Sequence, residues 1–331
     1  VHEWSVKNDK ELPMSEDFMP TYSDIARELH LSSIESWDEI SNWYSDLVRE
    51  QMEFDQTVED AFKKIFPNGV ANLSDDEKAK KIYEYVTGNF SYSYVSFKQS
   101  GFVPQKPEKT IKTKLGDCKD FSTLFAVLGK EAGLDVNLVL VLTSDYGKNA
   151  LILPSTDFNH CIVKVTIDGK PQFLELTDKY LPYKALPVSL RNATGLEIPY
   201  NKGAIQGNEL FKIYNVNRKK STFLNDYIVD IADESSNIHL TTSVTGHLSS
   251  YYIELLSDDN ENVKKEKISD DLLNRTKVDV ELVSVDKVDK KVGDDKVAFE
   301  TTITLNEKLN KIGSMKTFQL PYFSIPYNQS V

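Results

Sequence analysis

Gly116-Asp117-Cys118-Lys119-Asp120 is the stretch that decides the fold of this chain, because a helical pattern begins directly after it. Gly133 is well placed to end that helix, since glycine readily adopts the left-handed conformation that follows many helices. Cys118 is then expected in the first turn, where free N–H groups and the helix dipole favour a thiolate. It is therefore a candidate nucleophile. The apolar residues that follow it at the spacing of one helix face are Phe121, Leu124, Phe125 and Leu128.

The composition is ordinary for a soluble globular protein of two or three domains, with 331 residues of which 40% are hydrophobic and 27% charged. The net charge of −12 argues against nucleic acid as a partner, because a binder needs a basic surface for phosphates. No stretch approaches the ~18 apolar residues of a membrane-spanning helix. No signal peptide is visible, but the chain begins at Val1, so this says little about location.

The two cysteines, Cys118 and Cys161, are too few for a disulfide scaffold in a chain of this length. A Cys118–Cys161 bridge is possible but is not the favoured reading. One cysteine and one histidine with no second pair nearby do not make a zinc site. We therefore expect neither a metal nor a cofactor.

Patterns before residue 205 predict a mixture of helices and strands. Two capping boxes, Ser36-Trp37-Asp38-Glu39 and Ser74-Asp75-Asp76-Glu77, mark helix starts. Residues 1–35 read as a lead-in without strong periodicity, and residues 36–204 as one domain. Besides the helix after Cys118, the expected helices cover residues 36–52, 57–66 and 74–87, and the expected strands cover 90–97, 136–142, 161–167 and 172–176.

After about residue 205 the pattern changes to strand-like alternation, interrupted by one helical stretch at residues 261–274. Residues 205–331 are therefore predicted to form a separate, mostly β domain with a sandwich-like fold. The expected strands lie at 227–231, 238–244, 278–283 and 297–305.

A cysteine nucleophile needs a base that can also carry a positive charge, so histidine is the first candidate. His160 stands at the start of a strand, just before a hairpin signal at Asp168-Gly169. The other four histidines lie in the lead-in or in the later β domain: His2, His30, His239 and His247.

The hairpin register indicates which acid could orient His160. With a two-residue loop at Asp168-Gly169, Glu175 lies diagonal to His160 on the same face, about 7–8 Å away. A three-residue loop would flip every side chain and bring Asp178 to that face instead. Pro171 favours the first register, because it then falls in a pair that needs no N–H donor. We therefore prefer Glu175 as the acid and keep Asp178 as the alternative.

Cys161 points to the opposite, apolar face of the same strand in this register. It is therefore predicted to be an ordinary buried cysteine. Taken singly, Cys118 and His160 each favour a structural role, and Glu175 alone indicates nothing. Their order along the chain, however, suits cysteine–histidine–carboxylate chemistry.

The sequence resembles the transglutaminase-like superfamily at three motifs, over roughly residues 70–190. These motifs are the Gly-Asp-Cys helix start at 115–120, the Asn-His strand start at 158–160, and the aromatic-Leu-acid-x-Thr strand at 173–177. More narrowly, it resembles bacterial proteins, often of the Bacteroidetes group, that carry a further N-terminal domain and a C-terminal β domain. Residues 1–35 would then be the tail of a missing N-terminal domain.

The resemblance implies an α+β, papain-like core in which the cysteine helix packs on an antiparallel sheet. It assigns the nucleophile to Cys118, the base to His160 and the orienting acid to Glu175. Glutamate replaces the family's usual aspartate, and Leu176 replaces its usual proline. The Cys118 backbone N–H is the expected first oxyanion donor, and Gln99 or Gln105 could supply a second.

The leading hypothesis is thiol-dependent acyl transfer or hydrolysis on amide bonds of a protein or peptide, through a Cys-His-Glu triad and a thioester. Hydrolysis is favoured over cross-linking. The alternative is a non-catalytic module that binds a partner at the cell surface. The resemblance also implies an extracytoplasmic location.

Overall fold

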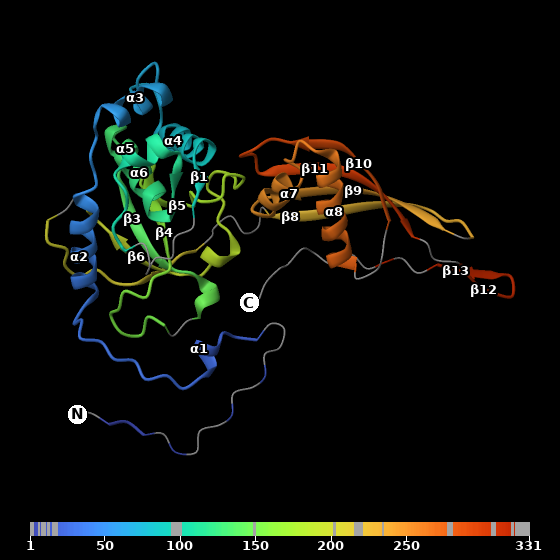
Figure 1. Cartoon of the computed structure of the whole chain (residues 1–331), viewed down its shortest axis with the longest axis horizontal. Helices are drawn as coiled ribbons and strands as arrows, with labels where there is room; N and C mark the ends of the chain where they lie inside the picture. Colours follow the sequence, from blue (N-terminus) through green and yellow to red (C-terminus); the bar gives the residue numbers. More distant parts are fainter. Residues whose placement is uncertain are drawn as a thin grey trace.

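The structure, a computed structural model, describes most of the chain (Figure 1). The described residues are 3–5, 7, 11, 14, 19–93, 101–147, 150–200, 203–214, 221–233, 235–276, 281–305, 309–318 and 321.

The helices of the first half begin where polar caps meet an apolar stripe. The Ser36 side chain accepts a hydrogen bond from the Glu39 N–H, and Ser74 forms a reciprocal capping box with Glu77. Both predicted helix starts are therefore confirmed. The helices are α1 (Tyr22–Ile25), α2 (Trp37–Arg49), α3 (Gln56–Ile65), α4 (Asp75–Asn89), α5 (Pro107–Thr113) and α6 (Cys118–Glu131), with short 3-10 turns at Ser144–Tyr146 and Val188–Leu190.

A five-stranded antiparallel sheet of order β5-β4-β3-β6-β7 supports α6 on one face. Side chains of α6 and of the strands' inward positions form one buried core, with Phe125, Leu138 and Val163 at its centre. A small parallel pair, β1 (Ser91–Tyr92) with β2 (Leu115–Gly116), lies just before the α6 start. The five strands are β3 (Val136–Leu142), β4 (His160–Ile167), β5 (Lys170–Leu174), β6 (Thr194–Ile198) and β7 (Phe211–Lys212).

The β4–β5 hairpin has the predicted register. Ile167 pairs with Lys170 and Thr166 with Pro171, so Asp168-Gly169 is a two-residue loop. Both loop residues have positive φ, 50° and 71°, as a type I′ turn requires. Cys161 lies in the core beneath α6, as expected.

The C-terminal half contains a four-stranded antiparallel sheet of order β10-β11-β9-β8. Every second residue of β9 is buried, among them Ile238 and Leu240, because one sheet face packs on two helices. The strands are β8 (Thr222–Asp230), β9 (Ser236–Thr245), β10 (Glu281–Lys290) and β11 (Lys296–Leu305), the helices are α7 (Leu248–Leu255) and α8 (Glu261–Thr276), and a hairpin follows at β12 (Asn310–Ile312) and β13 (Met315–Thr317).

This arrangement differs from the sandwich that we expected. Within the described residues, α7 and α8 cover the apolar face of the sheet where a sandwich would place a second sheet (Figure 1). The predicted helix at residues 261–274 is thus one of the elements that close this core. β7 also extends the first sheet past residue 204, where we place the domain boundary, and that boundary stays a prediction. No described helix is both long and apolar enough to cross a membrane.

Candidate active site

Cys118 is the first residue of α6, and the residues around it build the helix start. The Asp117 side chain accepts hydrogen bonds from the N–H groups of Lys119 (2.9 Å) and Asp120 (3.2 Å). In return, the Asp120 carboxylate accepts one from the Asp117 N–H at 3.0 Å. This reciprocal capping box fixes the backbone on both sides of Cys118, whose side chain is 4% exposed.

The cap leaves the N–H of Cys118 available. The first N–H of a helix has no acceptor within the helix, and the Asp117 carboxylate takes the next two. Among the described residues, none accepts a hydrogen bond from the Cys118 N–H. It can therefore donate to an oxyanion formed at the sulfur.

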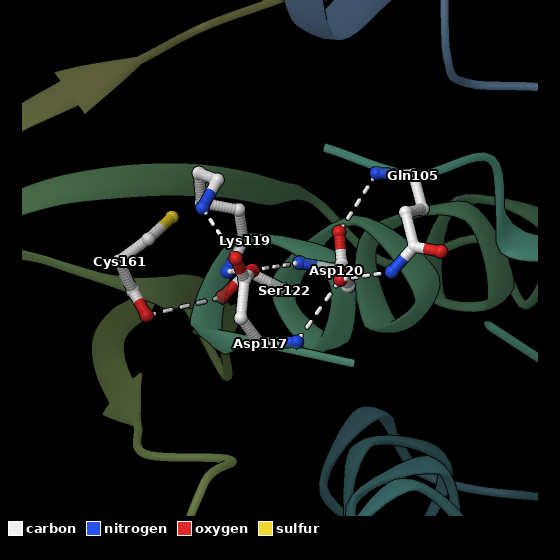
Figure 2. A network of polar contacts seen from close by, with 6 residues as sticks. All are labelled: Gln105, Asp117, Lys119, Asp120, Ser122 and Cys161. Carbon is white, nitrogen blue, oxygen red and sulfur yellow. Dashed lines mark hydrogen bonds and ion pairs between the residues drawn. The ribbon is translucent and has the colours of Figure 1, made fainter. Parts of the chain in front are cut away.

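A buried polar network surrounds this turn (Figure 2). The Lys119 ammonium, 1% exposed, lies 2.5 Å from the second carboxylate oxygen of Asp117. Asp120 receives the Gln105 backbone N–H at 2.7 Å and its side-chain Nε2 at 2.6 Å. The loop that enters α5 is thereby fastened to the start of the cysteine helix.

His160 and Glu175 form the second half of the site. His160 Nε2 lies 2.6 Å from Glu175 Oε2. The other oxygen of Glu175 accepts hydrogen bonds from the Thr177 N–H (2.8 Å) and hydroxyl (2.7 Å). Glu175 is 3% exposed, so both of its oxygens are held by protein groups away from water. Glu175 therefore engages Nε2 of His160 and not its other ring nitrogen, Nδ1.

Electrostatics favour a charged His160 beside a charged Glu175. Burial lowers the pKa of His160, but the Glu175 carboxylate and hydrogen bonds with the Cys118 and Glu175 side chains outweigh it, and the pKa is raised well above its ordinary value. For Glu175 burial acts in the other direction and raises the pKa. The charge of His160 and the hydrogen bonds from His160 and Thr177 outweigh burial and bring the pKa of Glu175 below its ordinary value. An imidazolium held in this way can stabilise a neighbouring thiolate.

The remaining candidates have other partners. Asp178, the alternative acid, accepts a hydrogen bond from the Tyr180 N–H at 2.8 Å. The side-chain amide of Gln105 donates a hydrogen bond to Asp120, so it does not serve as an oxyanion donor in this structure. Gln99 lies outside the described residues. Cys118 and Cys161 are both free thiols.

The polar network at the α6 start was not predicted. Its signal is an Asp-x-x-Asp pattern, a less common form of the capping box, at residues 117–120. Gln105 could not be paired with Asp120 from the sequence, because no local periodicity links a loop residue to a helix fifteen residues later.

A cavity of about 340 Å³ lies beside the α6 start, lined in part by Gln105, Lys109 and Asp120. Neither Cys118 nor His160 is among its lining residues. Among the described residues, no group of three or more His, Cys, Asp or Glu side chains could hold a metal ion.

The fold and the site define a class of protein: an α+β domain in which a helix that begins with a cysteine packs on an antiparallel sheet, next to a strand that begins with a histidine. Residues 66–174 match the family model described as the transglutaminase-like superfamily, so this part of the chain is similar to that superfamily. The matched range includes Cys118 and His160 and ends one residue before Glu175.

A solved structure from Parabacteroides distasonis, described as "a putative protease", is similar to this chain with a TM-score of 0.38 and 10% identity. The match covers 81% of this chain and 53% of the other, so the chain spans about half the length of that protein. No curated protein matches the chain.

Proposed function

We propose that Cys118, His160 and Glu175 form a catalytic triad for acyl chemistry on amide bonds. The observation that carries the proposal is the 2.6 Å contact between His160 Nε2 and the buried Glu175 carboxylate, at the start of a strand on which the helix that begins with Cys118 packs. A buried acid with both oxygens occupied, one of them by a histidine, is typical of an orienting group.

The reaction proceeds in two acyl-transfer steps. His160 takes the proton of the Cys118 thiol, and the sulfur attacks the amide carbonyl carbon. The developing oxyanion accepts a hydrogen bond from the backbone N–H of Cys118. When the C–N bond breaks, His160 returns its proton to the departing amine, leaving a thioester on Cys118. Water, deprotonated by His160, then attacks the thioester and releases a carboxylic acid and the free thiol.

The substrate is a protein or a peptide, cleaved at a peptide bond or at a glutamine side chain. We favour hydrolysis over transfer to a second amine, in line with the leaning of bacterial members of the family. By the same resemblance, the protein acts outside the cytoplasm.

Alkylation of the native protein by iodoacetamide tests the triad. We expect one label per molecule, on Cys118, at a rate that titrates below the ordinary thiol pKa of about 8.5. His160→Ala should slow labelling at pH 6–7 by about 10-fold or more, whereas His239→Ala, an exposed strand histidine of the C-terminal sheet, should not.

Cys118→Ala is the control for labelling of Cys161. Slow labelling of the wild type at pH 6–7, unchanged in His160→Ala, would overturn the proposal and favour a binding module. If labelling is fast, profiling with a peptide library then identifies the amide that is cleaved.

A further inference from the structure

Asn159, the residue directly before His160, joins the two ends of the loop between β3 and β4. Its Oδ1 accepts a hydrogen bond from the Thr143 N–H at 3.0 Å, and its Nδ2 donates one to the Thr143 hydroxyl at 2.7 Å. β3 ends at Leu142 and β4 begins at His160, so both bonds lie at the base of this loop. A backbone N–H can only donate, which fixes the orientation of the Asn159 amide.

This contact continues the β3–β4 ladder past its last backbone pair. His160 pairs with Val141, and the Asn159 N–H donates to the Val141 carbonyl at 3.0 Å. Thr143 is 8% exposed, and its N–H donates to the Asn159 side chain rather than to a backbone carbonyl. A buried N–H needs an acceptor, so the asparagine supplies one where backbone pairing stops.

His160 needs such support because it is the first residue of its strand. Strand ends open more easily than strand centres, since fewer backbone hydrogen bonds hold them. On the loop side of Asn159, Phe158 is 2% exposed and lies edge-on to Trp37, with ring centroids 6.2 Å apart. On the strand side, the His160 ring contacts Glu175. The Asn159 amide thus fixes the backbone directly beside the histidine.

The rest of the loop has separate supports. The Ser23 hydroxyl donates to the Tyr146 carbonyl at 3.1 Å, and the Ser32 hydroxyl donates to the Pro154 carbonyl at 2.5 Å. Both donors precede α2 in the chain. The loop therefore keeps these contacts when the Asn159 side chain is removed, and the expected change is confined to the loop base.

We propose that Asn159 is a positioning residue, which closes the loop at Thr143 and so holds His160 in line with Glu175. This inference rests on the proposed function, because it assigns Asn159 a part in aligning the base. Asn159 itself touches neither the thiol nor the substrate in this role, and it acts only through His160.

The consequence should be visible in the His160 ring and in the reactivity of Cys118. Burial lowers the pKa of His160 and the Glu175 carboxylate raises it, so a ring that moves away from the carboxylate should titrate at a lower pH. Reactivity depends steeply on alignment, and a shift of about 1 Å can cost on the order of 100-fold.

The test measures Cys118 alkylation by iodoacetamide and an NMR titration of His160 in variants of the full chain. Asn159→Ala removes both bonds and should slow labelling at pH 6–7 by about 10-fold, with a lower His160 pKa. Thr143→Val removes only the hydroxyl and should slow labelling by about 3-fold. Thr143→Ser keeps the hydroxyl and should restore the wild-type rate and the His160 pKa.

Matched controls lie at the opposite end of the same two strands. Asn137 of β3 donates from Nδ2 to Glu197 at 2.7 Å, and the Thr166 hydroxyl of β4 donates to Asp135 at 2.8 Å. Asn137→Ala and Thr166→Val remove comparable side-chain bonds far along the ladder from His160. Both variants should label like the wild type and keep its His160 pKa.

Melting temperatures separate positioning from general stabilisation. If Asn159→Ala melts earlier but keeps the wild-type labelling rate and His160 pKa, Asn159 is structural and the inference is wrong. Equal slowing by Thr143→Ser and Thr143→Val, or by Asn137→Ala and Asn159→Ala, would also contradict it. In these cases the triad still stands, because wild-type labelling stays fast and depends on His160. Failure of the triad differs: the wild type then labels slowly and His160→Ala changes nothing, which overturns both.

Discussion

Glu175 and Asp178 are three residues apart, yet their carboxyl groups have different partners. Glu175 lies one residue beyond the β5 ladder, where the pleat still directs its side chain towards His160. The Asp178 carboxylate instead accepts a hydrogen bond from the N–H of Tyr180, two residues later in the chain. The longer glutamate side chain suits a diagonal position, because it must reach across from a neighbouring strand.

Glu175→Gln tests the electrostatic part of this arrangement. The carboxylate is a main cause of the raised His160 pKa, so the neutral amide should let that pKa fall towards the ordinary 6.5. The measurement is an NMR titration of the His160 ring. We also expect alkylation of Cys118 at pH 7 to slow by about 10-fold or more.

Glu131→Gln removes an exposed carboxylate at the far end of α6 and serves as the matched control. An unchanged His160 pKa in Glu175→Gln would show that the carboxylate does not govern its charge. The raised pKa also affects stability: protonated His160 stabilises the folded state below the pKa of the unfolded chain, and this stabilisation is lost as the pH rises through the folded-state pKa.

The contact between Glu175 and His160 could be derived from the sequence, because the register of a hairpin sets which residues lie close together. A two-residue loop and period-2 alternation set which residues face each other, and Pro171 discriminated between the two registers. The ties of Glu175 to Thr177 could not be derived in this way. They depend on how the chain bends after the ladder ends, and no sequence period describes that bend.

At the scale of elements, the start of α6 does more than begin a helix. Its capping box, the buried Lys119–Asp117 ion pair and the Gln105 clamp all converge on one turn. Hydrogen bonds to charged, buried acceptors are stronger than exposed ones, and each donor left without an acceptor is costly. Substitutions in this turn should therefore be among the most destabilising in the fold.

Asp120→Ala should therefore destabilise the protein more than an ordinary cap deletion. It leaves the Asp117 N–H and both Gln105 donors without an acceptor, and we expect a loss of about 3 kcal/mol in the free energy of unfolding. Ser74→Ala, which breaks the exposed capping box of α4, should cost about 1 kcal/mol. Urea denaturation measures both, and equal losses would contradict a special role for Asp120.

The predicted helices with strong caps and long apolar stripes are confirmed, whereas α5 and α7 were not anticipated. α5 has only seven residues, too few for a periodic signal. α7 begins after His247, without a side-chain cap, and carries apolar side chains on more than one face. Its stability comes from packing on β9 and β11, which local sequence does not reveal.

At the scale of the whole molecule, a half-buried histidine lies where the two units meet. His247 Nδ1 faces the Arg191 guanidinium at 2.6 Å and the Ser221 hydroxyl at 3.1 Å. Burial, and then the charge of Arg191, lower the pKa of His247 to about 4. The contact therefore requires a neutral imidazole that accepts from Arg191, and protonation would place two cations side by side.

The contact should make the assembly of the two units sensitive to acid. Between pH 6.5 and about 4 the unfolded chain binds a proton at His247 that the folded chain does not, so this site contributes stability that falls as the pH falls. Since the ring is partly exposed, we expect a loss of only about 1–2 kcal/mol between pH 7 and 4.5. His247→Gln, which can still accept from Arg191, should lose less stability over this range in urea denaturation. His239→Gln, an exposed histidine, should follow the wild type, and identical pH profiles for all three proteins would contradict a neutral His247 at this contact.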